Sequence, residues 1–288
     1  MNKVKVFFWD VQHGNAVYIN TPNNRHIVID LGIGSYSENK EFSPLLYLKN
    51  VLKIKQLDYV IITHPHLDHI DDIMNFDLLN PKVFLRPKHL KRENILKNVR
   101  EQDREKFEKY FEINDRYNVP VSESSNEYPY NPANWGGLKI KTFIPKNCSQ
   151  SNINNHSIVT VIKYADIKII FLGDNEKCSY NELLKYEEFK KWIRNSDILL
   201  AAHHGRNSGY HNEFMSLVNP RLTIISDGRF NDTSATEKYS KKSRGLKVYK
   251  RDGSSEHRYC LTTRKDGRIK VEFGYDGNNN FLYVETGK

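Results

Sequence analysis

The residues with the clearest capacity for chemistry form the segment H-P-H-L-D-H that begins at His64 and follows a continuous apolar run. Such a run is typical of a buried strand. Because side chains two positions apart in an extended chain face the same way, His64 and His66 can present both imidazoles to one ion. A helix beginning near Ile70 would carry Asp68 and His69 to the other side, where they can hold a second ion. Imidazole and carboxylate are the ligands expected for Zn, Fe or Mn.

Further candidate ligands lie beside other predicted strands. Asp174, His203 and His204 each come at the end of an apolar run, and His156 comes just before one. An unpaired carboxylate at a buried strand end is costly, whereas Asp174 could bridge two cations. Separate strand ends therefore converge on one set of nitrogen and oxygen donors.

Two aspartates near the ends of early strands have two interpretations. Asp10 and Asp30 either accept hydrogen bonds from metal-binding imidazoles, and so orient them, or shape turns. The histidines outside the motifs, His89 among them, are predicted to be surface residues.

The composition excludes several classes of protein. The chain has 288 residues, of which 38% are hydrophobic and 12% aromatic, so it is neither disordered nor collagen-like. A chain of this length buries enough surface to fold without a structural metal, so a predicted metal serves chemistry. Its apolar runs are too short to span a bilayer and its N-terminus lacks a signal-peptide core, so we expect a cytoplasmic protein without membrane association.

Cysteine content and charge give weaker indications. Cys148, Cys178 and Cys260 show no C-x-x-C spacing, and we expect small buried side chains rather than a disulfide framework. The net charge of +9 favours anionic partners, although lysine-rich proteins often carry such charge for solubility alone.

The chain reads as two β-rich halves with accompanying helices, which predicts two sheets packed face to face with helices outside, in a single domain over 1–288. Helices are predicted at 43–53, 180–194, 211–218 and 234–244. Between the halves, 88–118 is predicted to be a helical insertion with one apolar face. That insertion either covers one flank of the protein or binds a protein partner.

The motifs resemble the metallo-β-lactamase superfamily. H-x-H-x-D-H at 64–69, G-D at 173–174 and H-H-G at 203–205 occur in the order found there. The segments DYVIITHPHLDHIDDI, IKIIFLGD and ILLAAHHG are similar more narrowly to the C-terminal hydrolase domain of the ComEC competence proteins and its free-standing relatives. The resemblance implies a four-layer αββα sandwich of the α/β class with two divalent metal ions, Zn or Mn.

The resemblance also implies a distribution of ligands. One ion would take His64, His66 and His156, and the other would take Asp68, His69 and His204, with Asp174 between them. His203 is the alternative to His204 as a ligand, and otherwise lies beside the site as a proton donor or substrate contact.

The chain departs from the competence proteins at several positions. His156 replaces an asparagine and would complete a three-histidine site, while His13 and Asn15 replace a glutamine and an aspartate. The change at Asn15 puts a supporting role for that position in doubt, and His13 becomes a candidate substrate contact. The transmembrane channel that accompanies the domain in ComEC is missing from this sequence.

These features favour a metal-dependent phosphodiesterase or nuclease acting on nucleic acid or nucleotide-like diesters. Two ions would activate a bridging water, Asp68 would orient it, and His203 or His13 would protonate the leaving group. One alternative is a hydrolase of a small ester, lactone or phosphocholine-type substrate. The other is a non-catalytic module regulated by a partner, against which the intact ligand set argues.

Overall fold

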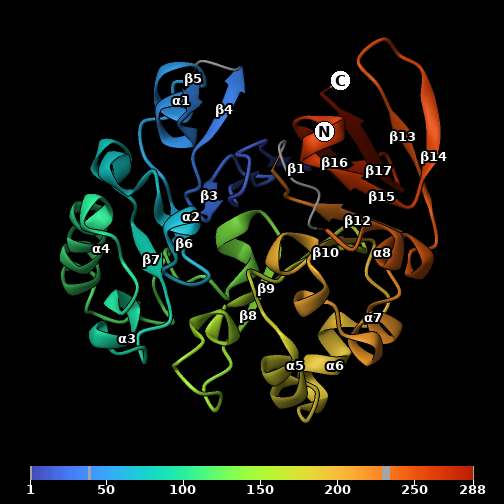
Figure 1. Cartoon of the computed structure of the whole chain (residues 1–288). Helices are drawn as coiled ribbons and strands as arrows, with labels where there is room; N and C mark the ends of the chain where they lie inside the picture. The colour runs from blue at the N-terminus through green and yellow to red at the C-terminus, as the bar shows by residue number, and fades with distance from the viewer. Residues whose placement is uncertain (1, 38–39, 229–233, 288) are drawn as a thin grey trace.

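Two large β-sheets form the centre of the protein (Figure 1). A computed structural model describes residues 2–37, 40–228 and 234–287. The first sheet has the strand order β14 (Ser255–Arg258), β13 (Leu246–Tyr249), β17 (Asn279–Thr286), β16 (Ile269–Asp276), β1 (Lys3–Phe8), β2 (Val17–Asn20), β3 (His26–Ile29), β6 (Tyr59–Ile61) and β7 (Val83–Leu85). The second has the order β15 (Cys260–Thr262), β12 (Leu222–Ile225), β11 (Ile198–Leu200), β10 (Ile167–Phe171), β9 (Val159–Tyr164) and β8 (Lys139–Phe143). A separate hairpin pairs β4 (Gly34–Ser37) with β5 (Lys40–Phe42).

The main hydrophobic core lies between the two sheets. Alternating residues of β1 are buried, which places Phe8 on the inner face, where its ring lies 6.0 Å from that of Phe171 on β10. The same core takes Val4 from the beginning of the chain and Val284 from near its end. Both β-rich halves therefore contribute to one core.

Helices cover the outer face of each sheet. The nine-stranded sheet is covered by α1 (Pro44–Asn50), α2 (Leu67–Ile70), η1 (Ile73–Leu79), α3 (Arg92–Leu96), η2 (Glu101–Asp103) and α4 (Arg104–Arg116). The six-stranded sheet is covered by α5 (Lys177–Leu183), α6 (Glu187–Ile193), α7 (Asn212–Val218) and α8 (Thr236–Lys242). Shorter segments are η3 (Pro132–Trp135), η4 (Ile153–His156), η5 (His203–Gly205), η6 (Asn207–Gly209) and α9 (Thr263–Asp266). The predicted αββα arrangement is confirmed.

Two helix predictions need correction in detail. The insertion at 88–118 contains two α-helices and a 3-10 turn rather than one continuous helix, because the face that buries Ile95 and the face that buries Phe107 lie on separate segments. The single helix predicted at 180–194 is divided into α5 and α6. The break lets both segments turn apolar side chains toward the six-stranded sheet.

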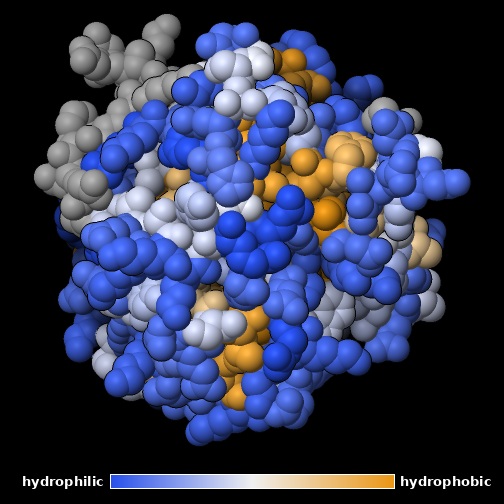
Figure 2. Space-filling view, turned by 90° about the vertical axis from the view of Figure 1, so that its right-hand side faces the viewer, coloured by the Kyte–Doolittle hydropathy of each residue, from blue (hydrophilic) through white to orange (hydrophobic). Residues whose placement is uncertain are grey.

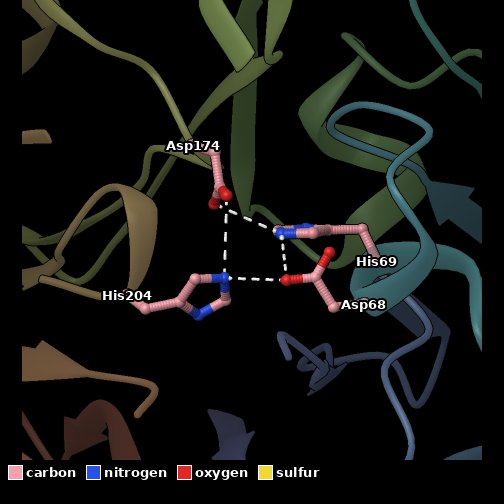
Figure 3. A group of neighbouring side chains, drawn as sticks. All are labelled: Asp68, His69, Asp174 and His204. Carbon is pink, nitrogen blue, oxygen red and sulfur yellow. Dashed lines mark hydrogen bonds and ion pairs between the residues drawn. The ribbon is translucent and has the colours of Figure 1, made fainter. Parts of the chain in front are cut away.

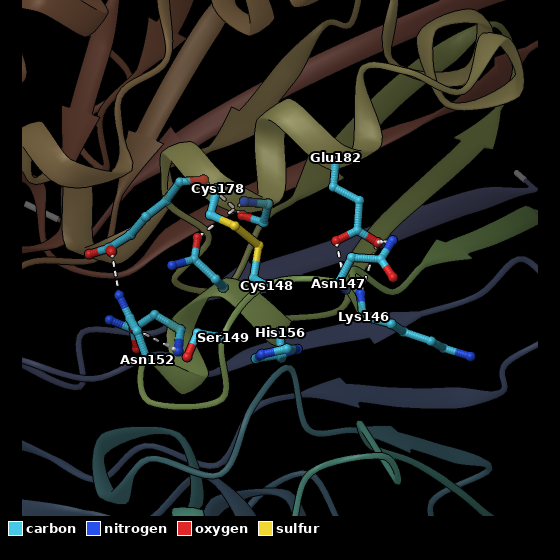
Figure 4. The surroundings of a disulfide bond; sticks show 12 residues. Lys146, Asn147, Cys148, Ser149, Asn152, His156, Cys178 and Glu182 are labelled. Carbon is cyan, nitrogen blue, oxygen red and sulfur yellow. Dashed lines mark hydrogen bonds between the residues drawn. A yellow bond between two sulfur atoms is a disulfide. The ribbon is translucent and has the colours of Figure 1, made fainter.

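The prediction that the cysteines are unpaired is wrong for Cys148 and Cys178, which form a disulfide with their Cα atoms 6.1 Å apart (Figure 4). Tertiary packing brings the loop before η4 against α5. There the Glu182 carboxylate accepts hydrogen bonds of 2.9 Å from the backbone N–H groups of Lys146 and Asn147. The disulfide thus fastens a loop that ends beside the candidate site to a helix of the outer layer.

The face of the molecule shown in Figure 2 is mostly hydrophilic, with smaller hydrophobic areas between charged and polar side chains. Within 2–37, 40–228 and 234–287, no helix is both long and apolar enough to cross a membrane.

Candidate metal site

The H-P-H-L-D-H segment joins β6 to α2. His66 is the N-cap of α2, and Asp68 and His69 lie within its single turn. The helix begins at Leu67, earlier than predicted, because the buried Ile70 closes that turn against the outer core. His64 lies in a bend and His66 in extended backbone, whereas the Asp-His pair lies within the helix, so the parts of the motif are presented by different local structures.

Asp174 and His204 reach the same place from the six-stranded sheet. Asp174 follows β10 through Gly173, whose φ is +57°. A Cβ at Gly173 would lie 2.8 Å from the Cβ atoms of both Ser157 and Thr63, so only glycine fits there. His204 follows β11 in a left-handed conformation with φ +53°. Non-glycine residues adopt this conformation rarely, and often at functional sites.

Asp68, His69, Asp174 and His204 surround a common centre (Figure 3). His204 Nε2 lies 3.1 Å from Asp68 Oδ2 and 3.6 Å from Asp174 Oδ2. His69 Nε2 lies 3.2 Å from Asp174 Oδ1 and 4.0 Å from Asp68 Oδ2. Two imidazole nitrogens and two carboxylates from both sheets thus face one another.

The donor set fits a divalent cation. His69 Nε2 is buried and makes no well-aligned hydrogen bond in the described part of the chain, although a carboxylate oxygen of Asp174 lies 3.2 Å away. A buried polar atom without a partner is rare, and a metal ion would satisfy it. Neutral imidazole and carboxylate oxygen are ligands of Zn and similar ions. We call Asp68, His69, Asp174 and His204 the four-residue group.

Buried hydrogen bonds fix the orientation of both imidazoles. Asp30 Oδ2 lies 2.8 Å from His69 Nδ1, and Ser226 offers its carbonyl oxygen 3.1 Å from His204 Nδ1. Each Nδ1 therefore donates outward, which leaves each Nε2 as the nitrogen that could bind an ion in place of its proton. Of the two interpretations of Asp30, the structure shows the one in which it orients an imidazole. Asn15, whose role was in doubt, donates to Asp30 at 2.8 Å.

A second pair of imidazoles adjoins the four-residue group. His64 Nε2 lies 2.9 Å from His66 Nδ1 and 3.9 Å from Asp174 Oδ2. The rings of His64 and His69 are 4.2 Å apart. Asp174 therefore stands between the two sets, the position in which a carboxylate can bridge two ions.

Electrostatics favour the metal-binding protonation states of Asp174 and His64, whereas the surrounding carboxylates outweigh burial and raise the pKa values of His69 and His204, so an ion would have to displace a proton from each. Burial opposes ionisation of Asp174, but His69 and His204 outweigh it and hold the pKa of Asp174 well below its ordinary value. Burial, together with the neighbouring histidines, lowers the pKa of His64 well below its ordinary value. An anionic carboxylate and a neutral imidazole are the forms in which both groups bind metals.

Comparison with known proteins relates part of the chain to one family. Residues 9–120 match the family model described as the Metallo-beta-lactamase superfamily. The matched segment contains the H-P-H-L-D-H motif. The chain is 26% identical over 238 residues to ComE operon protein 3 of Bacillus subtilis. The aligned region covers 77% of this chain and 28% of that protein. The chain is also 30% identical over 97 residues to Recombination protein 2 of Haemophilus influenzae, in an alignment that covers 34% of this chain and 12% of that protein.

The chain therefore spans less than a third of the length of either relative. Among solved structures it is similar to the metallo-beta-lactamase fold protein YhfI from Bacillus subtilis. That comparison has a TM-score of 0.48 and 11% sequence identity, and it covers 99% of this chain and all of YhfI.

His156, the predicted third histidine of the first ion, is not part of the four-residue group, and its buried Nε2 has no hydrogen-bond partner in the described part of the chain. Its Nδ1 is 2.9 Å from Nε2 of His89, which is half-buried rather than on the surface as predicted. Among the described residues, no contact joins His156 to His64 or His66. The pairing depends on packing between the insertion and η4, which the local motif does not reveal.

The two predicted proton donors flank the site. His13 stacks against His204 with ring centroids 4.6 Å apart, and burial lowers its pKa, helped by His204. His203 Nε2 lies 4.0 Å from Asp174 Oδ2, and its Nδ1 lies 3.0 Å from Glu176 Oε1. Sequence reasoning missed Glu176 and also Arg206, which contacts both histidines; each lies two residues after a predicted ligand.

Proposed function

We propose that this protein is a metal-dependent phosphodiesterase that acts on nucleic acid or nucleotide-like diesters. The observation that carries the proposal is a cavity of about 480 Å³ that is lined by Asp68 and also by basic side chains. His66 and Asp68 of the metal motif line it together with Lys97 and Arg100 of the insertion. Amide side chains, including Asn152, complete the lining.

Charge explains why a phosphodiester suits this cavity. Lys97 is exposed, and Arg100 extends to the surface while pairing with Asp103 at 2.6 Å. Basic side chains bind the phosphate backbone and orient it without reading sequence. The net charge of +9 would further attract a polyanion. The names of the relatives, a ComE operon protein and a recombination protein, support the same class of substrate.

The residues present divide into defined roles. His69, Asp174, Asp68 and His204 would hold one ion, and His64 with His66 would contribute to a second beside Asp174. Divalent ions, when bound, activate water for attack and neutralise charge on the phosphoryl oxygens. Asp68 is the most exposed member of the four-residue group, with a side chain 29% accessible, so it can orient the attacking water from the cavity side. Asp30 keeps His69 in the required tautomer.

Cleavage assays test the proposal. The protein would be incubated with single- and double-stranded DNA, RNA, cyclic nucleotides and small chromogenic esters in the presence of Mn or Zn. A variant carrying Asp68→Ala and His69→Ala is the control. We expect metal-dependent cleavage of a diester that the variant loses. Cleavage of small esters alone would replace the proposal with a small-substrate hydrolase, and absence of cleavage with less than one ion bound per chain would favour the non-catalytic alternative.

A further inference from the structure

Arg206 lies between two histidines that come from distant parts of the chain. It follows η5 directly, and its Nη2 lies 2.9 Å from His13 Nε2. Its Nη1 lies 3.3 Å from His203 Nε2. A guanidinium group has no acceptor, so Arg206 is the donor in both hydrogen bonds. Both imidazoles therefore direct a lone pair toward it.

The charge of Arg206 has no counter-ion in the described part of the chain. No ion pair joins its guanidinium to a carboxylate there, and its Nε atom is buried without a hydrogen-bond partner. Neutral imidazoles accept its hydrogen bonds but do not cancel its charge. A partly buried cation in this situation is stabilised when an anion binds beside it.

The position of Arg206 defines where that anion would lie. One of its partners, His13, stacks on His204, and the other, His203, reaches Asp174 at 4.0 Å. The guanidinium thus borders the four-residue group on the side formed by His13 and His203. Lys97 and Arg100, by contrast, line the cavity beside His66 and Asp68.

We propose that Arg206 binds the non-bridging oxygens of the substrate phosphate; this inference rests on the proposed phosphodiesterase function. The planar guanidinium can donate two parallel hydrogen bonds to one phosphate, which a lysine ammonium cannot. His13 and His203 then act as positioning residues for Arg206. His203 fits this role because its Nε2 accepts from Arg206 while its Nδ1 faces Glu176 Oε1 at 3.0 Å. This assignment replaces proton donation from those two Nε2 atoms.

Phosphate binding tests the assignment without relying on turnover. Inorganic phosphate would be titrated calorimetrically into metal-loaded wild-type protein, Arg206→Met and Arg206→Lys. Arg251→Met, which changes an exposed arginine, is the matched control. We expect Arg206→Met to weaken phosphate binding about 10- to 100-fold, the loss typical of hydrogen bonds to a charged group. The phosphate affinity of Arg206→Lys should lie between those of the wild type and Arg206→Met. In both variants the bound metal and the melting temperature should stay at the wild-type level.

Parallel kinetics with bis(p-nitrophenyl) phosphate and a neutral chromogenic ester separate the two proposals. A lower kcat/KM of Arg206→Met for the diester, with the neutral ester unaffected, would support the assignment. If the wild type cleaves the diester and Arg206→Met binds phosphate and cleaves equally well, the assignment of Arg206 is wrong and the phosphodiesterase proposal stands. If the wild type cleaves only the neutral ester, the phosphodiesterase proposal itself fails.

Discussion

Asp30 Oδ2 lies 2.8 Å from His69 Nδ1, and both side chains are fully buried. Asp30 also accepts a hydrogen bond of 2.7 Å from the backbone N–H of Thr63, immediately before the metal motif. One carboxylate therefore fixes both an imidazole and the backbone that leads into the motif. Such supporting carboxylates fix the orientation of a metal-binding imidazole and raise its basicity.

Asp30→Asn should weaken metal binding by about 10- to 100-fold. The amide carries no negative charge, so it holds the Nδ1–H tautomer of His69 less strongly than the carboxylate does. Metal titration followed by elemental analysis measures the change. Asp58→Asn is a suitable control, because Asp58 also accepts a backbone hydrogen bond, from His26, but lies outside the site. Equal metal affinity in wild type and Asp30→Asn would contradict the role given to Asp30.

His69→Ala and His156→Ala should have different effects. His69 belongs to the four-residue group, so its loss should remove an ion, whereas His156 pairs with His89 and its loss should leave the metal content unchanged. Elemental analysis of both variants after dialysis makes the comparison. A His156→Ala protein that loses one ion would support the expectation that His156 is a ligand.

Gly173→Ala should destabilise the fold and disturb Asp174. The new Cβ would lie 2.8 Å from two side-chain carbons, and the backbone φ is +57°. We expect a loss of about 2 to 4 kcal/mol in the free energy of unfolding, the sum of overpacking and backbone strain. Urea denaturation measures it. Gly253→Ala separates the two causes, because Gly253 has φ +83° but no atom within 4 Å of a new Cβ; an equal loss in both variants would leave strain alone as the cause.

The number of reactive thiols tests the cysteine arrangement. Cys260 is buried, and burial raises its pKa to about 12, so at pH 8 only about one thiol in ten thousand is ionised. We expect negligible reaction with a thiol reagent in the native protein. Denaturation without reductant should expose one thiol per chain, and denaturation after reduction should expose three. Three thiols without reduction would exclude the Cys148–Cys178 disulfide.

The sequence was most informative where function depends on neighbours along the chain. His64, His66, Asp68 and His69 lie within six positions, so strand and helix periodicity suffices to predict two adjacent sets of donors. Asp174 and His204 could be predicted from the sequence because each follows a strand, and the ends of neighbouring parallel strands meet at one sheet edge.

Contacts that depend on tertiary packing could not be predicted in this way. His156 lies 67 positions from His89, and Arg206 lies 193 positions from His13. No periodicity relates such residues, so their pairing follows only from how the two sheets and the insertion pack. The Cys148–Cys178 disulfide was missed for the same reason.

The four-residue group draws Asp68 from the segment after β6 and His204 from the segment after β11, 136 positions apart and on different sheets. An ion held between them would act as a cross-link at the open edge of the sandwich. Folding and metal occupancy are then linked by mass action, and a free ion at 100 times its dissociation constant would add about 2.7 kcal/mol of stability. The supply of metal would thus govern resistance to unfolding and proteolysis even when no substrate is present.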